Sequence, residues 1–508
     1  MRRVAAAGPG FHARIGLAVT LTAAADFLLF DKPVGLSLLL FAALLCAGII
    51  AASPQDIGTP LVGKCLLLSA GLLPLVESAG TLSISIAVFS FALFALAMAR
   101  RLHGGLTAAV RQAVAFLLVA PFRLPIDVVR WRRAARRIGS ATIRLAGIAV
   151  WVMPIVLAVV FVALFGAANP VVEHWLSLID LRALLDLLSF WRLVFWLVAV
   201  LWVWAFLRPR LPVLGRHRPK LLTAALPKGP TAAPARLRET LFGKAAILRA
   251  LVVFNLIFAV QTVLDGTYLW GGVTLPEGLT YADYAHRGAY PLIATALLAA
   301  GFVLAAMRPG SATATDRTIR LLVYLWVVQN VILVLSSILR LDLYVDIYSL
   351  TYWRVAAFVW MMLVAAGLVL IMARIVLEKP NSWLMNANLL TLSLTLYACC
   401  FVNFAGLIAD YNVRHSFEMN GRGQLLDQSY LFALGPAAVP AIDLLLKDTN
   451  SGRVPGVIGL RQQREWLAAR HRERSSDWRA WTFRDWRLSR YLEENPAPPV
   501  QPARLFER

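Results

Sequence analysis

The stretch WRVAAFVWMMLVAAGLVLIMARIVL, residues Trp353–Leu377, indicates the fold class of this chain. Only Arg354 and Arg374 are charged, and both stand near its ends. A helix needs roughly 20 apolar residues to cross about 30 Å of hydrocarbon, so this run can span a bilayer. Similar runs recur along the 508 residues, of which 59% are hydrophobic. The sequence therefore predicts an all-α, polytopic helical integral membrane protein.

Working outward from this run, we expect about eleven transmembrane helices. An N-terminal membrane half (1–207) and a C-terminal half (246–408) flank a basic, Pro-rich linker (208–245). A polar helical tail (409–508), disordered at its end, follows. The predicted spans are Ile15–Phe30, Val34–Ala52, Leu61–Glu77, Thr81–Ala99, Ile143–Phe165, Trp191–Leu207, Ala246–Leu264, Gly288–Met307, Ile319–Leu339, Trp353–Leu377 and Leu384–Ile408.

The net charge of +22 lies mainly in loops, which favours a membrane surface over nucleic acid as the partner. The segment Arg100–Arg144 carries ten Arg residues and a single acid, Asp127. Its apolar patches, interrupted by Pro121 and Pro125, look too short to cross, which predicts an interfacial amphipathic segment that meets anionic lipids. An inner N-terminus puts every strongly basic loop inside and the tail outside. These features predict a multi-pass membrane protein.

The densest chemistry lies in LPEGLTYADYAHRGAY, residues Leu275–Tyr290, on the expected outer face. Thr280 and Asp283 resemble a capping box, and Asp283 and Arg287 form an i, i+4 pair. One interpretation is a capped helix with a surface ion pair. The other is a polar cavity lined by Glu277, Asp283, His286 and Arg287, whose carboxylates and imidazole would be catalytic if the protein is an enzyme.

Two further segments share the outer face. Residues Arg340–Tyr348 alternate polar and apolar side chains, so a strand or a helix would each present one wet face. Arg340, Tyr344, Tyr348 and Arg354 are ligand-binding candidates there, together with Arg287. The last segment holds Asn403 and Asp410–Asn412. In it Asp427 is predicted to cap a helix, and Gly435-Pro436 to end one helix and begin another.

Other common sites are missing from the sequence. There is no phosphate-binding loop, dinucleotide fingerprint, His-Glu-x-x-His or Gly-x-Ser-x-Gly motif. The four cysteines lie in apolar segments without zinc-ligand spacing. We therefore expect no cofactor and no metal.

Four motifs in order resemble a known bacterial membrane family: LPEGLTYADYAHRGAY, RLDLYVDIYSLTYWR, LIADYNV and YLFALGPAAVP. That family is domain of unknown function number four-one-seven-three, with sister family four-one-five-three. The resemblance covers roughly residues Arg249–Leu492 and, more loosely, the first half of the chain. Ser349 departs from the Gly expected before Leu350-Thr351, and Phe404-Ala405 from a frequent Pro-Asp. The resemblance implies a location in the bacterial inner membrane, but it implies no reaction, cofactor or substrate.

Three functions remain open. The first is a non-enzymatic envelope sensor or assembly scaffold that binds an envelope protein or a lipid-linked ligand outside. The second is an outer-face transferase acting on lipid-linked, phosphate-bearing precursors, with Glu277 or Asp283 as base and Arg287, Arg340 or Arg354 holding phosphate. The third is a secondary transporter, for which Asp26 and Lys64 are the charged residues inside spans.

Overall fold

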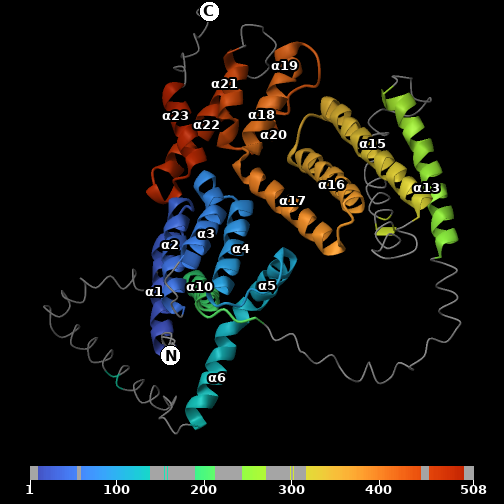
Figure 1. The fold of residues 1–508 in the computed structure, drawn as a ribbon. Helices are drawn as coiled ribbons and strands as arrows, with labels where there is room; N and C mark the ends of the chain where they lie inside the picture. Colours follow the sequence, from blue (N-terminus) through green and yellow to red (C-terminus); the bar gives the residue numbers. More distant parts are fainter. Residues whose placement is uncertain are drawn as a thin grey trace, which may run out of the picture. The chain divides into compact units, whose positions relative to one another are not determined.

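The computed structural model describes residues 10–53, 59–137, 189–211, 243–270, 316–447 and 457–496, with single helical positions at 154, 157, 298, 301 and 302. All regular elements in these ranges are helices, as predicted (Figure 1). The chain divides into two units. Unit 1 comprises Met1–Gly104, Ala108–Val213 and Trp478–Ala480, and unit 2 comprises Gly105–Thr107, Leu214–Asp477 and Trp481–Arg508.

By length and composition, eight segments of the described ranges can cross a membrane. They are Phe11–Leu29 (α1), Thr81–Met98 (α4), Leu106–Trp131, Phe190–Leu207 (α10), Lys244–Tyr268, Arg317–Tyr348 (α15), Tyr352–Val376 (α16) and Asn381–Phe401 (α17). Helix α2, Leu36–Ala52, is apolar but shorter, and α3, Thr59–Glu77, is not among the eight. The predicted spans 143–165 and 288–307 lie outside the described residues, apart from single positions. A polytopic protein is supported, whereas the count of eleven is not confirmed.

The arginine-rich segment corrects one prediction. Helices α5 (Leu106–Val119) and α6 (Arg123–Arg137) are joined by a single 3₁₀ turn, η1 (Ala120–Phe122), so Leu106–Trp131 is long and apolar enough to cross. Pro121 is the second residue of that turn, and Pro125 falls in the first turn of α6. Proline is tolerated in a first turn, because the N–H that it lacks would have no partner there. The two prolines therefore do not cut the apolar run into short patches.

The last predicted span, Leu384–Ile408, is also corrected, because it forms two helices. Helix α17 ends at Phe401 and α18 covers Phe404–Arg414. The side chain of Asn403 accepts a hydrogen bond from the Gly406 N–H at 3.2 Å and so caps α18. The membrane-spanning helix is therefore shorter than predicted, and a separate, more polar helix follows it.

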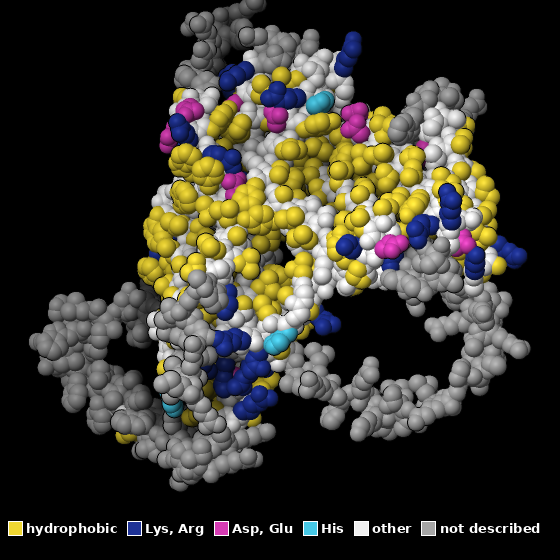
Figure 2. Space-filling view, viewed as in Figure 1, with side chains coloured by type: hydrophobic (Ala, Val, Ile, Leu, Met, Phe, Trp, Pro, Cys, Tyr) yellow, Lys and Arg dark blue, Asp and Glu magenta, His cyan; other side chains and the backbone are white. Residues whose placement is uncertain are grey.

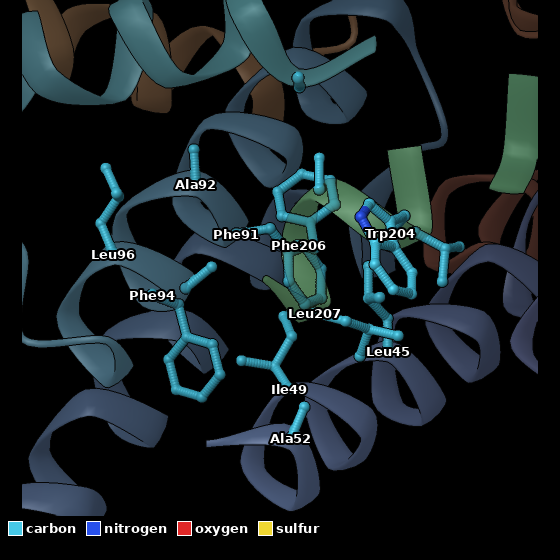
Figure 3. Packing of buried hydrophobic residues seen from close by; sticks show 14 of the residues in the cluster. Leu45, Ile49, Ala52, Phe91, Ala92, Phe94, Leu96, Trp204, Phe206 and Leu207 are labelled. Atoms are coloured by element: carbon cyan, nitrogen blue, oxygen red, sulfur yellow. The ribbon is translucent and has the colours of Figure 1, made fainter. Parts of the chain in front are cut away.

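Unit 1 has its core where α2 and α4 meet α10. Figure 3 shows Phe206 of α10 beside Phe91 of α4, and their ring centroids are 6.1 Å apart. Helices α1 and α10 also pack together, and Asp26 of α1 accepts hydrogen bonds from Arg192 Nε at 2.8 Å and Trp196 Nε1 at 2.9 Å. Asp26, a transporter candidate by sequence, thus has two partners on the neighbouring helix.

The membrane helices of unit 2 pack around Trp326 of α15, which is fully buried. Helix α13 (Lys244–Asp265) contacts α15, and the Phe258 and Trp326 ring centroids lie 6.3 Å apart. The Asn255 amide of α13 donates to the Leu322 carbonyl of α15 at 3.1 Å. Apolar packing and this polar contact hold the two helices together.

The tail forms a helical layer within unit 2. After α18 come α19 (Phe417–Asn420), α20 (Gln428–Ala433), α21 (Val439–Lys447), α22 (Val457–Ser475) and α23 (Phe483–Glu494). Asp427 caps α20, accepting from the Tyr430 N–H at 2.9 Å, as predicted. Gly435, at φ 79°, precedes a 3₁₀ turn that begins at Pro436, so the predicted break is also confirmed.

A buried ion pair joins three tail helices. Arg464 of α22 donates to Asp443 of α21 at 2.9 and 3.1 Å. The Tyr491 hydroxyl of α23 donates to the same carboxylate at 3.1 Å, and Arg464 also reaches the Asn495 carbonyl at 2.7 Å. Both charges are therefore paired and hydrogen-bonded, as buried charges require.

Candidate functional site

The segment that was open to a strand or a helix, Arg340–Tyr348, is the last part of helix α15. Helical geometry brings residues four apart together, and the Tyr344 and Tyr348 ring centroids are 4.6 Å apart. The Arg354 guanidinium lies 4.7 Å from the Tyr344 ring centroid and 5.8 Å from that of Tyr348. Three of the five ligand-binding candidates therefore meet at the turn between α15 and α16.

Arg354 binds the end of α15. Its Nη1 donates to the Tyr348 carbonyl at 2.5 Å and also to the Ser349 carbonyl. The last carbonyls of a helix carry partial negative charge, so a cation there is favourable. Ser349 has φ 64° and ψ 170°, a conformation that favours glycine. The positive φ at this position thus explains why the family resemblance leads one to expect Gly there.

Asn412 of α18 holds the same turn from the tail side. Its Oδ1 accepts from the Leu350 N–H at 2.7 Å, and its Nδ2 donates to the Leu350 carbonyl at 2.9 Å. Asn412 is 7% exposed and Leu350 is 6% exposed. One side-chain amide therefore satisfies both polar groups of a buried peptide position.

Two tyrosines of the tail add further contacts. The Tyr430 hydroxyl accepts from the Tyr352 N–H at 3.1 Å, and the Tyr411 hydroxyl lies 3.5 Å from Asp346 Oδ1. Burial raises the pKa of Tyr411, and the nearby Asp346 and Asp342 carboxylates raise it further, so the hydroxyl remains a donor. Three of the four family-like motifs thus converge on one turn.

This turn presents aromatic side chains outward. Trp353 is 87% exposed, Tyr348 is 50% exposed and Tyr352 is 49% exposed. The carboxylates of Asp342 and Asp346 are on the exposed side of α15 as well. We call the set Asp342, Asp346, Tyr348, Tyr352 and Trp353 the turn surface. It offers apolar area and negative charge, while Arg354 is bound to backbone carbonyls beneath it.

Arg340 lies elsewhere, in the interface between α13 and α15. It is 3% exposed and forms an ion pair with Asp265, which is 1% exposed and also accepts from Gln261 Nε2 at 2.9 Å. Sequence reasoning did not single out Asp265. The sequence does contain a signal for this ion pair, because Asp265 and Arg340 carry opposite charges and each stands one residue beyond a predicted span on the same side of the membrane.

The remaining sequence candidates cannot be placed with these. Glu277, Asp283, His286 and Arg287 lie outside the described residues. Within the described ranges, no three His, Cys, Asp or Glu side chains gather as a metal site would require.

Comparison with known proteins identifies the family. A family model described as domain of unknown function (DUF4153) matches residues 64–445, more than half of the chain. The primary family suggested by the motifs, number four-one-seven-three, is not the one that matches; its sister is. No curated protein and no solved structure matches significantly. The chain therefore belongs to the DUF4153 family of membrane proteins.

Proposed function

We propose that this protein is a non-enzymatic bacterial inner-membrane scaffold or sensor, which binds an envelope partner through the turn surface. The observation that supports this proposal is the hydrogen bonding that fixes the backbone of the turn. Asn412, Tyr430 and Arg354 each bond to its backbone, so exposed side chains stand on a rigid support. Exposed aromatic groups on a rigid frame are typical of protein interaction sites.

Charge supports an outer location for this surface. The opposite ends of the same helices carry more basic than acidic residues: Lys244, Arg249, Arg317, Arg320, Arg374 and Lys379 against Asp316 and Glu378. Lys and Arg collect on the cytoplasmic side, so this basic end belongs inside. The turn surface and the tail packed against it then face outward.

The arginines favour a scaffold over the transferase alternative. A phosphate-handling enzyme needs cations whose donors point at substrate. Arg340 is buried against Asp265, and Arg354 donates to main-chain carbonyls. Of the three arginines proposed to hold phosphate, two are thus engaged in holding the fold.

The test uses matched tryptophans on one helix. Trp353 belongs to the turn surface, whereas Trp360, 50% exposed, lies farther along α16. In a strain lacking the gene, envelope integrity is scored by sensitivity to detergent and osmotic shock. We expect Trp353→Leu to lose complementation at unchanged membrane abundance, and Trp360→Leu to retain it. Full complementation by Trp353→Leu combined with Tyr348→Ser would contradict the proposal.

The same assay addresses the enzyme alternative. Glu277→Gln and Asp283→Asn remove the two possible bases with little change of shape. A scaffold keeps complementing with either variant. Loss of complementation at unchanged abundance would favour the transferase instead.

A further inference from the structure

A cluster of arginines surrounds one buried carboxylate in unit 1. Asp127 of α6 is 2% exposed, and it accepts from Arg210 Nη1 at 3.0 Å and Trp204 Nε1 at 3.3 Å. Arg208 Nη1 lies 3.4 Å from Asp127 Oδ2, the oxygen that Trp204 also contacts. Arg14 of α1 and Arg123 of α6 complete the inner part of the group, and Arg130 lies at its exposed edge. Figure 2 shows Lys and Arg side chains gathered over α6.

These positive charges exceed the local negative charge. Within the described part of the chain, the five arginines 14, 123, 130, 208 and 210 face one carboxylate, that of Asp127. The adjoining sequence, residues 1–13, 132–144 and 209–225, contains no Asp or Glu and several more Arg. Burial lowers the pKa of the Arg208 guanidinium, Asp127 opposes this, and Arg210, Arg14 and Arg130 lower it further. Unopposed like charges at this density are unfavourable unless an anion joins them.

Hydrogen-bond donors are also in surplus. Arg14 uses one nitrogen on the Ala52 carbonyl at 3.1 Å, and Arg123 uses one on the Arg210 carbonyl. A guanidinium has five N–H donors. Among the described residues, no partner meets the buried Nε–H groups of Arg14, Arg123 and Arg208. Asp127 already has three donors directed at it, so the remaining ones need another acceptor.

Aromatic side chains indicate how deep in the membrane the cluster lies. Phe11 stacks on Trp131 with centroids 5.3 Å apart, and the Arg208 guanidinium lies 5.9 Å from the Phe11 ring centroid. Tryptophan gathers at the level of lipid headgroups. The cluster also lies where α1 begins and where α2 and α10 end, as expected at a membrane surface.

We propose that this arginine cluster is a binding site for a phosphate group, carried by an anionic lipid headgroup or by a free phosphate. Phosphate oxygens accept paired guanidinium hydrogen bonds and supply the missing negative charge. The site is separate from the turn surface, and its failure would leave the proposed scaffold function unaffected.

The test measures thermal unfolding of the full chain in a neutral detergent by tryptophan fluorescence. Three titrations are compared: phosphatidylglycerol, phosphatidylcholine and inorganic phosphate at constant ionic strength. We expect phosphatidylglycerol to raise the melting temperature and phosphatidylcholine not to. In Arg14→Gln/Arg123→Gln the apparent affinity should fall at least about tenfold, since each lost bond to a charged acceptor is substantial. The control is Arg111→Gln, which removes one positive charge from an exposed position of α5, against the two removed in the double variant.

Each outcome of this test either supports or overturns the proposed phosphate site. A response to phosphatidylglycerol alone identifies a headgroup site, and an equal response to inorganic phosphate identifies a site for a soluble phosphate. Absence of both responses, or equal loss in Arg111→Gln, overturns the proposal. If the double variant does not fold, Arg130→Gln replaces it, because that side chain is exposed. Its affinity should fall roughly two- to fivefold, and an unchanged affinity would overturn the site.

Discussion

Replacing Asn412 by leucine removes both hydrogen bonds that hold the turn between α15 and α16. Leu350 is 6% exposed, so its N–H and C=O would lose their partner away from water. A typical hydrogen bond contributes about 1 kcal/mol, and an orphaned buried polar group costs about 1–3 kcal/mol. We therefore expect Asn412→Leu to lower the free energy of opening this turn by about 2–5 kcal/mol.

Hydrogen exchange at the Leu350 amide, followed by mass spectrometry of the detergent-solubilised full chain, measures this change directly. A loss of about 2 kcal/mol corresponds to roughly 30-fold faster exchange. Asp410→Asn, on the same helix, breaks only the exposed pair with Arg414 and should cost less than about 1 kcal/mol. If Asn412→Leu exchanges at the wild-type rate, the amide does not hold the turn and the reasoning is refuted.

Three further predictions concern stability. Ser349→Gly should raise the free energy of unfolding by about 1 kcal/mol, and with it the melting temperature, because φ 64° with ψ 170° suits glycine. A lower melting temperature would contradict the conclusion that the backbone of Ser349 is strained. Arg340→Met leaves Asp265 buried without its cation and should destabilise by about 3–5 kcal/mol, while Asp265→Leu/Arg340→Met should recover part of this loss in the same unfolding assay. Burial lowers the pKa of His471 below its ordinary 6.5, so the unfolded chain binds its proton first. Its contribution to stability is therefore full above pH 6.5 and declines as the pH falls toward the lower folded pKa. Between pH 7.5 and 5.5, the melting temperature should depend less on pH in His471→Gln than in the wild-type protein.

Local signals in the sequence predicted several of these elements. Asp427 as an N-cap and Gly435-Pro436 as a break depend on neighbours only a few residues away, and both are confirmed. The prediction that Pro121 and Pro125 divide the apolar run was wrong, because the effect of a proline depends on where a helix begins, and the sequence alone did not show this. Asn403 stands out in the sequence only as a polar residue, and its role in separating α17 from α18 is seen only in the structure.

The apolar runs by themselves determined that this is a helical membrane protein, because backbone groups in lipid must be satisfied within each segment. Sequence also predicted that Tyr344 and Tyr348 lie close together if their segment is a helix, since residues four apart are neighbours there. The position of Arg354 beside them came only from the structure. Only the tertiary structure decided what pairs with residues far along the chain. Asn412 with Leu350, Asp265 with Arg340 and Asp127 with Arg210 join distant segments, and such contacts depend on how helices pack.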